Sequence, residues 1–317
     1  MKNYLVKKVV ISVLTLLIVI LILFLAMDLM PGTPFNNPKL SPEQREMLKS
    51  AYGLDKPVLI RYLIYVKNMF KGDFGVSYAL AIDTPVSELI IKRMPVSMAI
   101  GGAALALGSI GGLILGFTAA FTKYYIKKFG KIIDGICILI SILGISIPSY
   151  IIAIALSYFV GFKFRLLPLV YDFRNPAGSS IMAVLSLSFV VCAVITRYAR
   201  DEALEVLKSD YVLFAMTQGI RGPSLLFRYI IRNSFIGVIT VMAMMFVGLM
   251  TGSLVTEQIF SIPGIGFLLT SAINAKDYNV VISLSFVFAA LFIVVRLLLD
   301  IIYVLLDPRV RVVNDRR

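Results

Sequence analysis

Few side chains in this sequence could carry out covalent chemistry. Histidine, the commonest general base and metal ligand, does not occur. Cys137 and Cys192 are the only cysteines, and both lie in apolar runs, where a thiol behaves as a small hydrophobic group. The G-x-x-x-x-G-K-[ST] pattern that cradles nucleotide phosphates is also missing. We therefore expect no catalytic residue, no metal site and no cofactor bound by this chain, and any nucleotide-driven work must come from another polypeptide.

The stretch 200–233 is polar and basic, although it lies between two strongly apolar runs. Its apolar side chains recur every three or four residues, which predicts one face of an amphipathic helix: Leu204, Leu207, Tyr211 and Phe214. Gly219 is a candidate C-cap, and Arg221-Gly222-Pro223 predicts a sharp break before a second helix. This stretch is thus predicted to be a helix, a break and another helix.

Two roles remain open for the first of these helices. Asp201, Glu205 and Asp210 lie largely away from its apolar face. A helix resting on the bilayer would meet an anionic lipid leaflet, which these acids disfavour. A groove on a partner protein fits the mixture of charges better, so we favour partner docking over an interfacial helix.

The elements around this stretch are apolar enough to lie in a membrane. Apolar residues make up 59% of the 317 residues, above the roughly 45–50% of soluble domains. Charge-free runs near or above the length needed to cross about 30 Å of hydrocarbon lie at 9–27, 94–122, 135–162, 179–196, 234–256 and 278–295. They predict an all-α polytopic membrane protein with six transmembrane helices. The first run is too long for a signal peptide and lacks an A-x-A-like cleavage site, so we interpret it as a span.

The distribution of lysine and arginine predicts the orientation. With the N-terminus in the cytoplasm, basic residues concentrate in four cytoplasmic segments, whereas the short outer loops hold only Lys163, Arg165, Arg174 and Lys276. We therefore expect both termini in the cytoplasm. The net charge of +13 is explained by this topology and by contact with the lipid bilayer, and its dispersal argues against nucleic acid as a partner.

These spans divide the chain into four predicted regions. Residues 1–30 form the N-terminus and first span, 31–93 an external insertion between helices 1 and 2, 94–304 the remaining five-helix core with its loop 200–233, and 305–317 a cytoplasmic tail. The insertion is expected to form a small cap on the outer membrane face, which is compatible with docking an external partner.

Local motifs predict the structure of the insertion. A capping box at residues 41–44 starts a helix that Gly53 would close. Residues 57–70 predict a second helix and residues 72–75 a turn. Thr84-Pro85 predicts the start of a short helix that leads to Pro95.

Small residues and a proline predict how the spans pack. A stripe at four-residue spacing in the second span allows a neighbouring helix to approach closely, in this chain or in a second subunit: Ala104, Gly108, Gly112, Gly116 and Ala120. Pro148 predicts a kink in the third span. Arg296 and Asp300 share one face of the last span and are expected to form an ion pair.

A turn-rich apolar loop, residues 258–275, follows the fifth span on the outer side. Its Pro263-Gly264-Ile265-Gly266 segment is compatible with a gate or with a re-entrant connector that has no gating role. Glu257 and Asp28 lie at the outer ends of the fifth and first spans, near this loop. There they would face a vestibule or be solvated.

Motifs from the first span to the C-terminus resemble one family. They are MPGTP at 30–34, YGLDKP at 52–57, GDFG at 72–75, IPS at 147–149, DYV at 210–212, Ala215, Gly219, Arg232-Asn233, FSIPGIG at 260–266 and LDPR at 306–309. In this order they are similar to the B-type permease subunit of oligopeptide and dipeptide ABC importers. Leu213 and Phe214 stand where the family's broader loop pattern has Glu and Ala, which implies a more apolar contact.

The resemblance implies a type I ABC importer permease fold in a prokaryotic cell membrane. The chain would be a non-enzymatic subunit forming half of a pathway, with a homologous second permease, two ATP-binding subunits and an extracytoplasmic solute-binding protein. ATP and Mg would bind to the ATP-binding subunits. The implied ATPase-coupling residues are Leu207, Asp210, Tyr211, Phe214, Ala215, Gly219, Arg221 and Gly222. The implied external gate or binding-protein contact consists of Ser261, Ile262, Pro263, Gly264, Ile265 and Gly266.

Peptides are the expected substrate of such a permease. The same architecture importing nickel or a metal chelate is an alternative. An ion-coupled secondary transporter is an alternative of another class, but it would normally carry acids or histidines within its spans, which are almost free of ionisable groups here.

Overall fold

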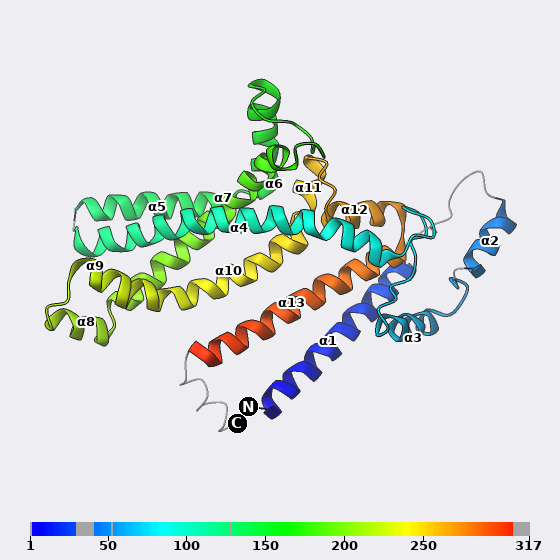
Figure 1. The fold of residues 1–317 in the computed structure, drawn as a ribbon, viewed down its shortest axis with the longest axis horizontal. Coiled ribbons are helices and arrows are strands. Elements are labelled where there is room, and N and C mark those ends of the chain that lie inside the picture. The colour runs from blue at the N-terminus through cyan, green and yellow to red at the C-terminus, as the bar shows by residue number, and fades with distance from the viewer. Residues whose placement is uncertain (1, 30–40, 52, 127, 307–317) are drawn as a thin grey trace. The chain divides into compact units, whose positions relative to one another are not determined.

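The computed structural model describes residues 2–29, 41–51, 53–126 and 128–306 (Figure 1). The motif at 30–34 and the tail after residue 306 lie outside the described residues. The side chains of Asp28 and Asp300 are also outside the description, so the expected vestibule charge and the expected ion pair of Arg296 stay predictions.

The described residues contain helices and no strand. Six helical segments among them are long and apolar enough to cross a membrane, which confirms the predicted number of spans. They lie in α1 (Lys2–Leu29), α4 (Val86–Tyr125), α5 (Phe129–Ser146), α7 (Pro176–Leu207), the continuous pair η2 (Leu225–Ile231) and α10 (Arg232–Gly252), and α13 (Tyr278–Leu306). The fold is therefore that of an all-α polytopic membrane protein.

Pro148 interrupts the third predicted span, as expected, but the interruption is complete. Helix α5 ends at Ser146, Ile147 is extended, and α6 (Ser149–Leu156) begins after Pro148 and continues into the π-helical η1 (Ser157–Lys163). A proline has no N–H to donate and pushes the preceding residue out of helical geometry. The third span is therefore α5, and the predicted bounds 135–162 are wrong because a second, shorter apolar helix occupies residues 149–163.

The short helix predicted between Thr84 and Pro95 is also not a separate element. Helix α4 starts at Val86 and passes through Pro95 without ending. A proline removes one backbone donor, and long membrane helices tolerate that loss.

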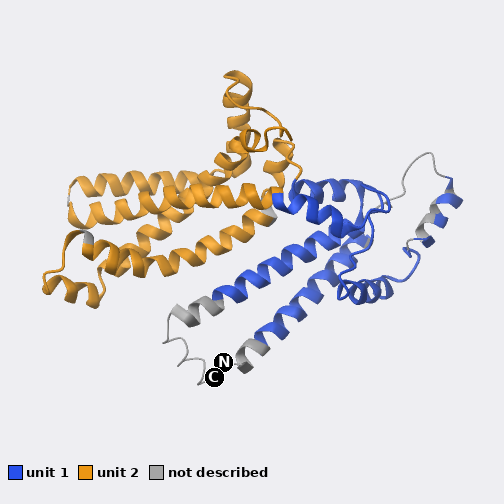
Figure 2. Cartoon of the chain, viewed as in Figure 1, with its two compact units in different colours: residues 1–95, 264–317 blue, residues 96–263 orange. Residues whose placement is uncertain are grey.

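The chain forms two compact units (Figure 2). Unit 1 consists of residues 1–95 and 264–317, and unit 2 of residues 96–263. In unit 1, α1 packs along α13 and against α3 (Val58–Met69), and α12 (Ile265–Ala275) packs on α13. The core of unit 1 gathers Phe24, Tyr65 and Ile282.

The described residues of the predicted insertion, 41–51 and 53–93, belong to unit 1, and its first two helices follow local sequence signals. The backbone N–H of Ser41 donates to Gln44 Oε1 and that of Gln44 to Ser41 Oγ, so the capping box at the start of α2 (Pro42–Ala51) is confirmed. Gly53 has a φ of +66°, the left-handed conformation expected after a helix end. The predicted second helix is confirmed as α3.

The loop that follows α3 is attached to the first turns of α13 by side-chain hydrogen bonds. Asp277 is fully buried, and its Oδ2 accepts from the Ser77 hydroxyl and from the backbone N–H groups of Ala79 and Leu80. Asn279 Nδ2 donates to the Val76 carbonyl at 2.9 Å. These bonds fix the loop to the start of α13.

In unit 2, α7 is the central helix and packs against α5, α6 and α10. The small-residue stripe of α4 also lies against α7. A Cβ added at Gly108 would stand 2.5 Å from the Ser188 carbonyl oxygen, one at Gly112 2.7 Å from the Ile195 Cβ, and one at Gly116 2.6 Å from the Thr196 carbonyl oxygen. Any larger side chain there would force the two helices apart, so the stripe packs within this chain.

Candidate coupling site

A turn divides the amphipathic helix predicted between residues 204 and 214. Helix α7 ends at Leu207, Lys208 caps it, and Ser209 is extended with a ψ of 148°. A new helix, α8 (Asp210–Thr217), begins at once, with the N–H groups of Val212 and Leu213 bonded to the Ser209 carbonyl. The single apolar face predicted here is therefore wrong: Leu207 is completely buried, whereas Tyr211 and Phe214 are exposed.

Helix α8 is anchored by its own buried face. Val212 and Ala215 are buried in a cluster that also contains Leu207 at the end of α7 and Leu225 and Ile230 in η2. Such a short helix is marginal in isolation, and tertiary packing of this kind supplies most of its stability. The anchoring cluster therefore determines the orientation of α8.

The C-terminal end of α8 is a Schellman motif. The N–H of Ile220 donates to the Ala215 carbonyl and that of Gly219 to the Met216 carbonyl. Gly219 has a φ of +83°, so the predicted C-cap is present. Arg221 is extended and Gly222 has a φ of +63°, after which the short α9 (Gly222–Ser224) leads into η2 (Figure 1). The chain thus reverses sharply and returns to the span that follows.

Other side chains of α8 are apolar and remain exposed in the described chain. Phe214 is 63% exposed, Tyr211 46% and Leu213 45%. These three residues are called the α8 face below. Asp210 at the first turn is exposed as well. An exposed cluster of large apolar side chains on a short helix is typical of a surface that docks in a groove on another protein.

A partly buried ionic cluster lies at the end of the helix bundle from which α8 projects. Asp134 on α5 is 5% exposed and binds Lys123 of α4 and Arg200 of α7. The Lys123 Nζ lies 2.8 Å from Asp134 Oδ2, and the Arg200 Nη2 lies 2.9 Å from the same oxygen. Removing Asp134 or Arg200 would leave a largely buried charge uncompensated, so this pair holds α5 and α7 together, and the exposed Lys123 adds a contact from α4.

Sequence reasoning did not find this ionic cluster. The available signal was Asp134 itself, a single acid at the edge of a long apolar run, which in a membrane protein predicts a basic partner on a neighbouring helix.

No group of three or more Cys, Asp or Glu side chains in the described part of the chain is arranged to hold a metal ion.

The six predicted gate residues do not form one surface. Ser261 is exposed, with a φ of 52°, but Ile262 is fully buried in a core of unit 2 and Ile265 belongs to the core of unit 1. The chain passes from unit 2 to unit 1 between Pro263 and Gly264. The gating role of these residues, Gly266 included, stays a prediction.

Glu257, expected at a vestibule or in solvent, is buried instead. It lies in α11 (Leu254–Ile259) and is 1% exposed. Its Oε1 accepts hydrogen bonds of 2.7 Å from the Ser97 and Ser253 hydroxyls. A buried carboxylate with two hydroxyl donors joins α11 to the start of the second span rather than facing a vestibule.

These features define a class: a polytopic α-helical membrane protein with a short helix between two spans that exposes large apolar side chains. Two family models match the chain and place it more narrowly. The model described as "Binding-protein-dependent transport system inner membrane component" matches residues 112–312, and the model of the N-terminal part of such membrane components matches residues 1–101. The chain belongs to this family.

Individual relatives match nearly the whole chain. A dipeptide transport system permease protein, DppB of Lactococcus lactis subsp. cremoris, is 41% identical over 98% of this chain and 100% of its own length. An oligopeptide transport system permease protein, OppB of Haemophilus influenzae, is 31% identical over 98% of this chain and 100% of its own. The inward-facing MetNI methionine ABC transporter has a chain of similar fold, with a TM-score of 0.57 and 14% identity over 70% of this chain and 97% of that one.

Proposed function

We propose that this chain is the transmembrane permease subunit of an ATP-driven peptide importer and forms half of its translocation pathway. Its membership of the binding-protein-dependent family supports import coupled to a solute-binding protein. The full-length relatives named as dipeptide and oligopeptide permeases support peptides over nickel or metal chelates. The same family membership favours ATP-driven transport over ion-coupled transport.

The observation that carries this proposal is the construction of α8. One face of the helix is buried in the anchoring cluster, and the other exposes Tyr211, Leu213 and Phe214. A helix fixed on one side moves as a rigid body with the span to which it is attached, whereas a flexible loop would absorb the displacement. We infer that the α8 face sits in a groove on an ATP-binding subunit and transmits its movement to α7 and α10.

The predicted coupling residues then have distinct roles. Tyr211 and Phe214 contact the ATP-binding subunit, with Asp210 at the edge of that contact. Leu207 and Ala215 are buried and hold α8 in place. Gly219, Arg221 and Gly222 form the reversal that returns the chain to η2.

The other partners follow from the family. A homologous second permease would complete the pathway, two ATP-binding subunits would bind ATP and Mg and hydrolyse the nucleotide, and an extracytoplasmic solute-binding protein would deliver the peptide. Both termini and α8 would then lie in the cytoplasm, and Ser261 would lie on the opposite side, where it is exposed to the binding protein.

The test uses the complete importer reconstituted in liposomes. We expect the peptide-loaded binding protein to stimulate ATP hydrolysis and peptide uptake. Combining Tyr211→Ala with Phe214→Ala is expected to reduce uptake by at least about tenfold, since buried aromatic anchors contribute roughly 2 kcal/mol or more to interfaces. Phe129→Ala, which truncates an exposed aromatic residue at the start of α5, is the matched control and should leave uptake unchanged.

Peptide uptake by this chain alone, driven by an ion gradient, would refute the proposal. Unchanged uptake and ATP hydrolysis in the Tyr211 and Phe214 double variant would refute the coupling role of α8 while leaving peptide import itself intact.

A further inference from the structure

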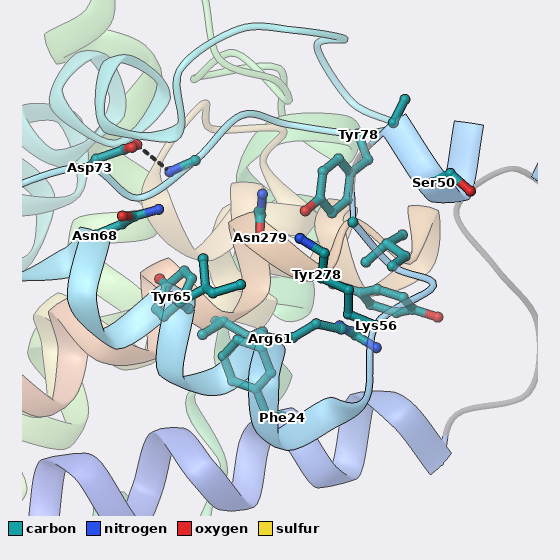
Figure 3. A pocket seen from close by; sticks show the side chains of 16 residues that line it. Phe24, Ser50, Lys56, Arg61, Tyr65, Asn68, Asp73, Tyr78, Tyr278 and Asn279 are labelled. Atoms are coloured by element: carbon teal, nitrogen blue, oxygen red, sulfur yellow. Dashed lines mark hydrogen bonds between the residues drawn. The ribbon is translucent and has the colours of Figure 1, made fainter. Parts of the chain in front are cut away.

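A pocket of about 350 Å³ with polar and apolar lining opens within unit 1 (Figure 3). The external insertion, the outer end of α1 and the first turns of α13 line it. Side chains that reach it include Lys56, Arg61, Asp73, Tyr78, Tyr278 and Asn279. Its volume falls within the range of small-molecule sites, about 300–1,000 Å³.

The walls of this pocket are held in place by bonds within unit 1. The Tyr65 hydroxyl lies 2.9 Å from the Ser283 hydroxyl, and Asn279 donates to the Val76 carbonyl. The N–H of Gly75 donates to Asp73 Oδ1 at 2.8 Å, which orients the carboxylate. A Cβ at Gly75 would stand 2.6 Å from Asn279 Nδ2, so the turn and α13 meet too closely for a side chain there. The wall formed by α3, the 73–75 turn and α13 is therefore preformed, which lowers the entropic cost of binding.

The charges of the pocket are separated. Figure 3 shows Asp73 and Asn68 on one side and Lys56 on the opposite side, with Tyr278 and Asn279 between them. Arg61 adds a second cation to the lining. The rings of Phe24, Tyr78 and Tyr278 supply apolar surface between the charged ends. A purely anionic ligand would be repelled by Asp73, and a purely cationic one by Lys56 and Arg61.

We propose that this pocket binds a free short peptide as a zwitterion. The Asp73 carboxylate receives the N-terminal ammonium, and Lys56 with Arg61 receives the C-terminal carboxylate through charge-assisted hydrogen bonds. The tyrosine and phenylalanine rings contact the peptide side chains without selecting among them. This inference rests on the proposed peptide import, and it adds to it a substrate contact on the permease itself, in the external insertion.

The test measures peptide binding by the complete importer in nanodiscs, without the solute-binding protein, by isothermal titration calorimetry. The probes are trialanine, N-acetyl-trialanine and trialanine amide. We expect trialanine to bind and each blocked form to bind more weakly, by about threefold to tenfold, the range for partly exposed charged pairs. Asp73→Asn should weaken trialanine and trialanine amide but leave N-acetyl-trialanine unchanged. Lys56→Gln should weaken trialanine and N-acetyl-trialanine but leave the amide unchanged.

The matched controls are Asp55→Asn and Lys71→Gln, exposed residues of the same insertion that do not line the pocket. They should leave all three affinities unchanged. Asparagine keeps an acceptor for the Gly75 N–H, so Asp73→Asn tests charge rather than folding of the turn.

Two results would overturn the inference. One is no binding of trialanine without the binding protein, and the other is binding that neither Asp73→Asn nor Lys56→Gln weakens. If the two substitutions instead impair only the stimulation of ATP hydrolysis by the binding protein, the pocket receives a charged part of that protein and not the peptide. None of these results bears on peptide import itself, which uptake and ATP hydrolysis by the complete importer measure independently.

Discussion

Two regions of this chain are attached to their units by different forces. The loop 74–81 of the insertion is fixed to α13 by side-chain hydrogen bonds in which Asp277 accepts and Asn279 and Ser283 donate. Helix α8 is fixed by apolar packing and by the Schellman motif that Gly219 closes. Polar bonds fix the loop in one geometry, whereas apolar packing on one face of α8 leaves three large apolar side chains free to meet another protein. Polar bonds therefore suit the insertion to the proposed receptor role, and one-sided apolar packing suits α8 to the proposed docking role.

The largest expected effect is the loss of the polar attachment of the insertion. Asp277→Ala leaves the buried Ser77 hydroxyl and two part-buried N–H groups without their charged acceptor, so we expect about 3–5 kcal/mol of local destabilisation. Hydrogen–deuterium exchange at residues 77–81 measures it. Asp277→Asn, which keeps an acceptor oxygen, should cost less, and Asp55→Ala at an exposed site should stay within about 0.5 kcal/mol. Unchanged exchange in Asp277→Ala would show that these hydrogen bonds do not hold the loop in place.

The next effect concerns the apolar anchor of α8. Leu207 is fully buried, so Leu207→Ala removes packing and leaves a cavity, which costs about 2–4 kcal/mol. We expect faster hydrogen exchange in residues 210–217 and no change in residues 77–81. Faster exchange in both segments would contradict an attachment of α8 that is local and apolar.

A pH-dependent effect of intermediate size is expected in the insertion. Burial raises the pKa of Tyr65 to about 12, partly offset by its hydrogen bond with Ser283. The unfolded chain ionises this tyrosine near pH 10, before the folded chain does, so stability is full below pH 10 and falls as the pH rises towards 12. A difference of two pKa units between the folded and unfolded chain corresponds to a loss of about 2.7 kcal/mol in the free energy of unfolding. Melting temperatures from pH 9 to 12 should fall less steeply for Tyr65→Phe than for the wild type. Equal slopes of melting temperature against pH for the two proteins would show that Tyr65 ionises as an exposed tyrosine.

The smallest effect on stability is expected on the α8 face. Phe214 is 63% exposed and belongs to no buried cluster, so Phe214→Ala should change the free energy of unfolding by less than about 0.5 kcal/mol. Thermal unfolding of the purified chain measures this. A melting temperature lowered as much as in Leu207→Ala would mean that Phe214 stabilises the fold of this chain, which would contradict its role as a partner contact.

Features with local causes could be predicted from the sequence. The six spans follow from apolar composition, the capping box from Ser41 and Gln44, the break in the third span from Pro148, and the end of α8 from Gly219. Each depends on residues within about one turn of one another, or on the membrane as a solvent, so the signal is contained in the sequence itself.

The contacts that escaped prediction join residues far apart in the chain. Asp134 and Arg200 are separated by 66 positions, and Asp277 and Ser77 by 200. No periodicity reports such pairings. The division between α7 and α8 was missed for another reason: apolar spacing of three and four residues continues across the turn and suggested one helix. Ser209 followed by Asp210, a typical helix start, was the signal that could have located the new helix.

Cross-linking from α8 is the most direct measurement of whether this helix docks on an ATP-binding subunit. In an importer whose Cys137 and Cys192 are replaced by serine, a single Phe214→Cys substitution is compared with Ala215→Cys, one position further along the same helix. Because position 214 is exposed and position 215 is 2% exposed, we expect cross-links from 214 to the ATP-binding subunit and few or none from 215. Cross-links from 214 to lipid alone, or labelling of 214 from outside intact cells, would contradict a cytoplasmic coupling helix.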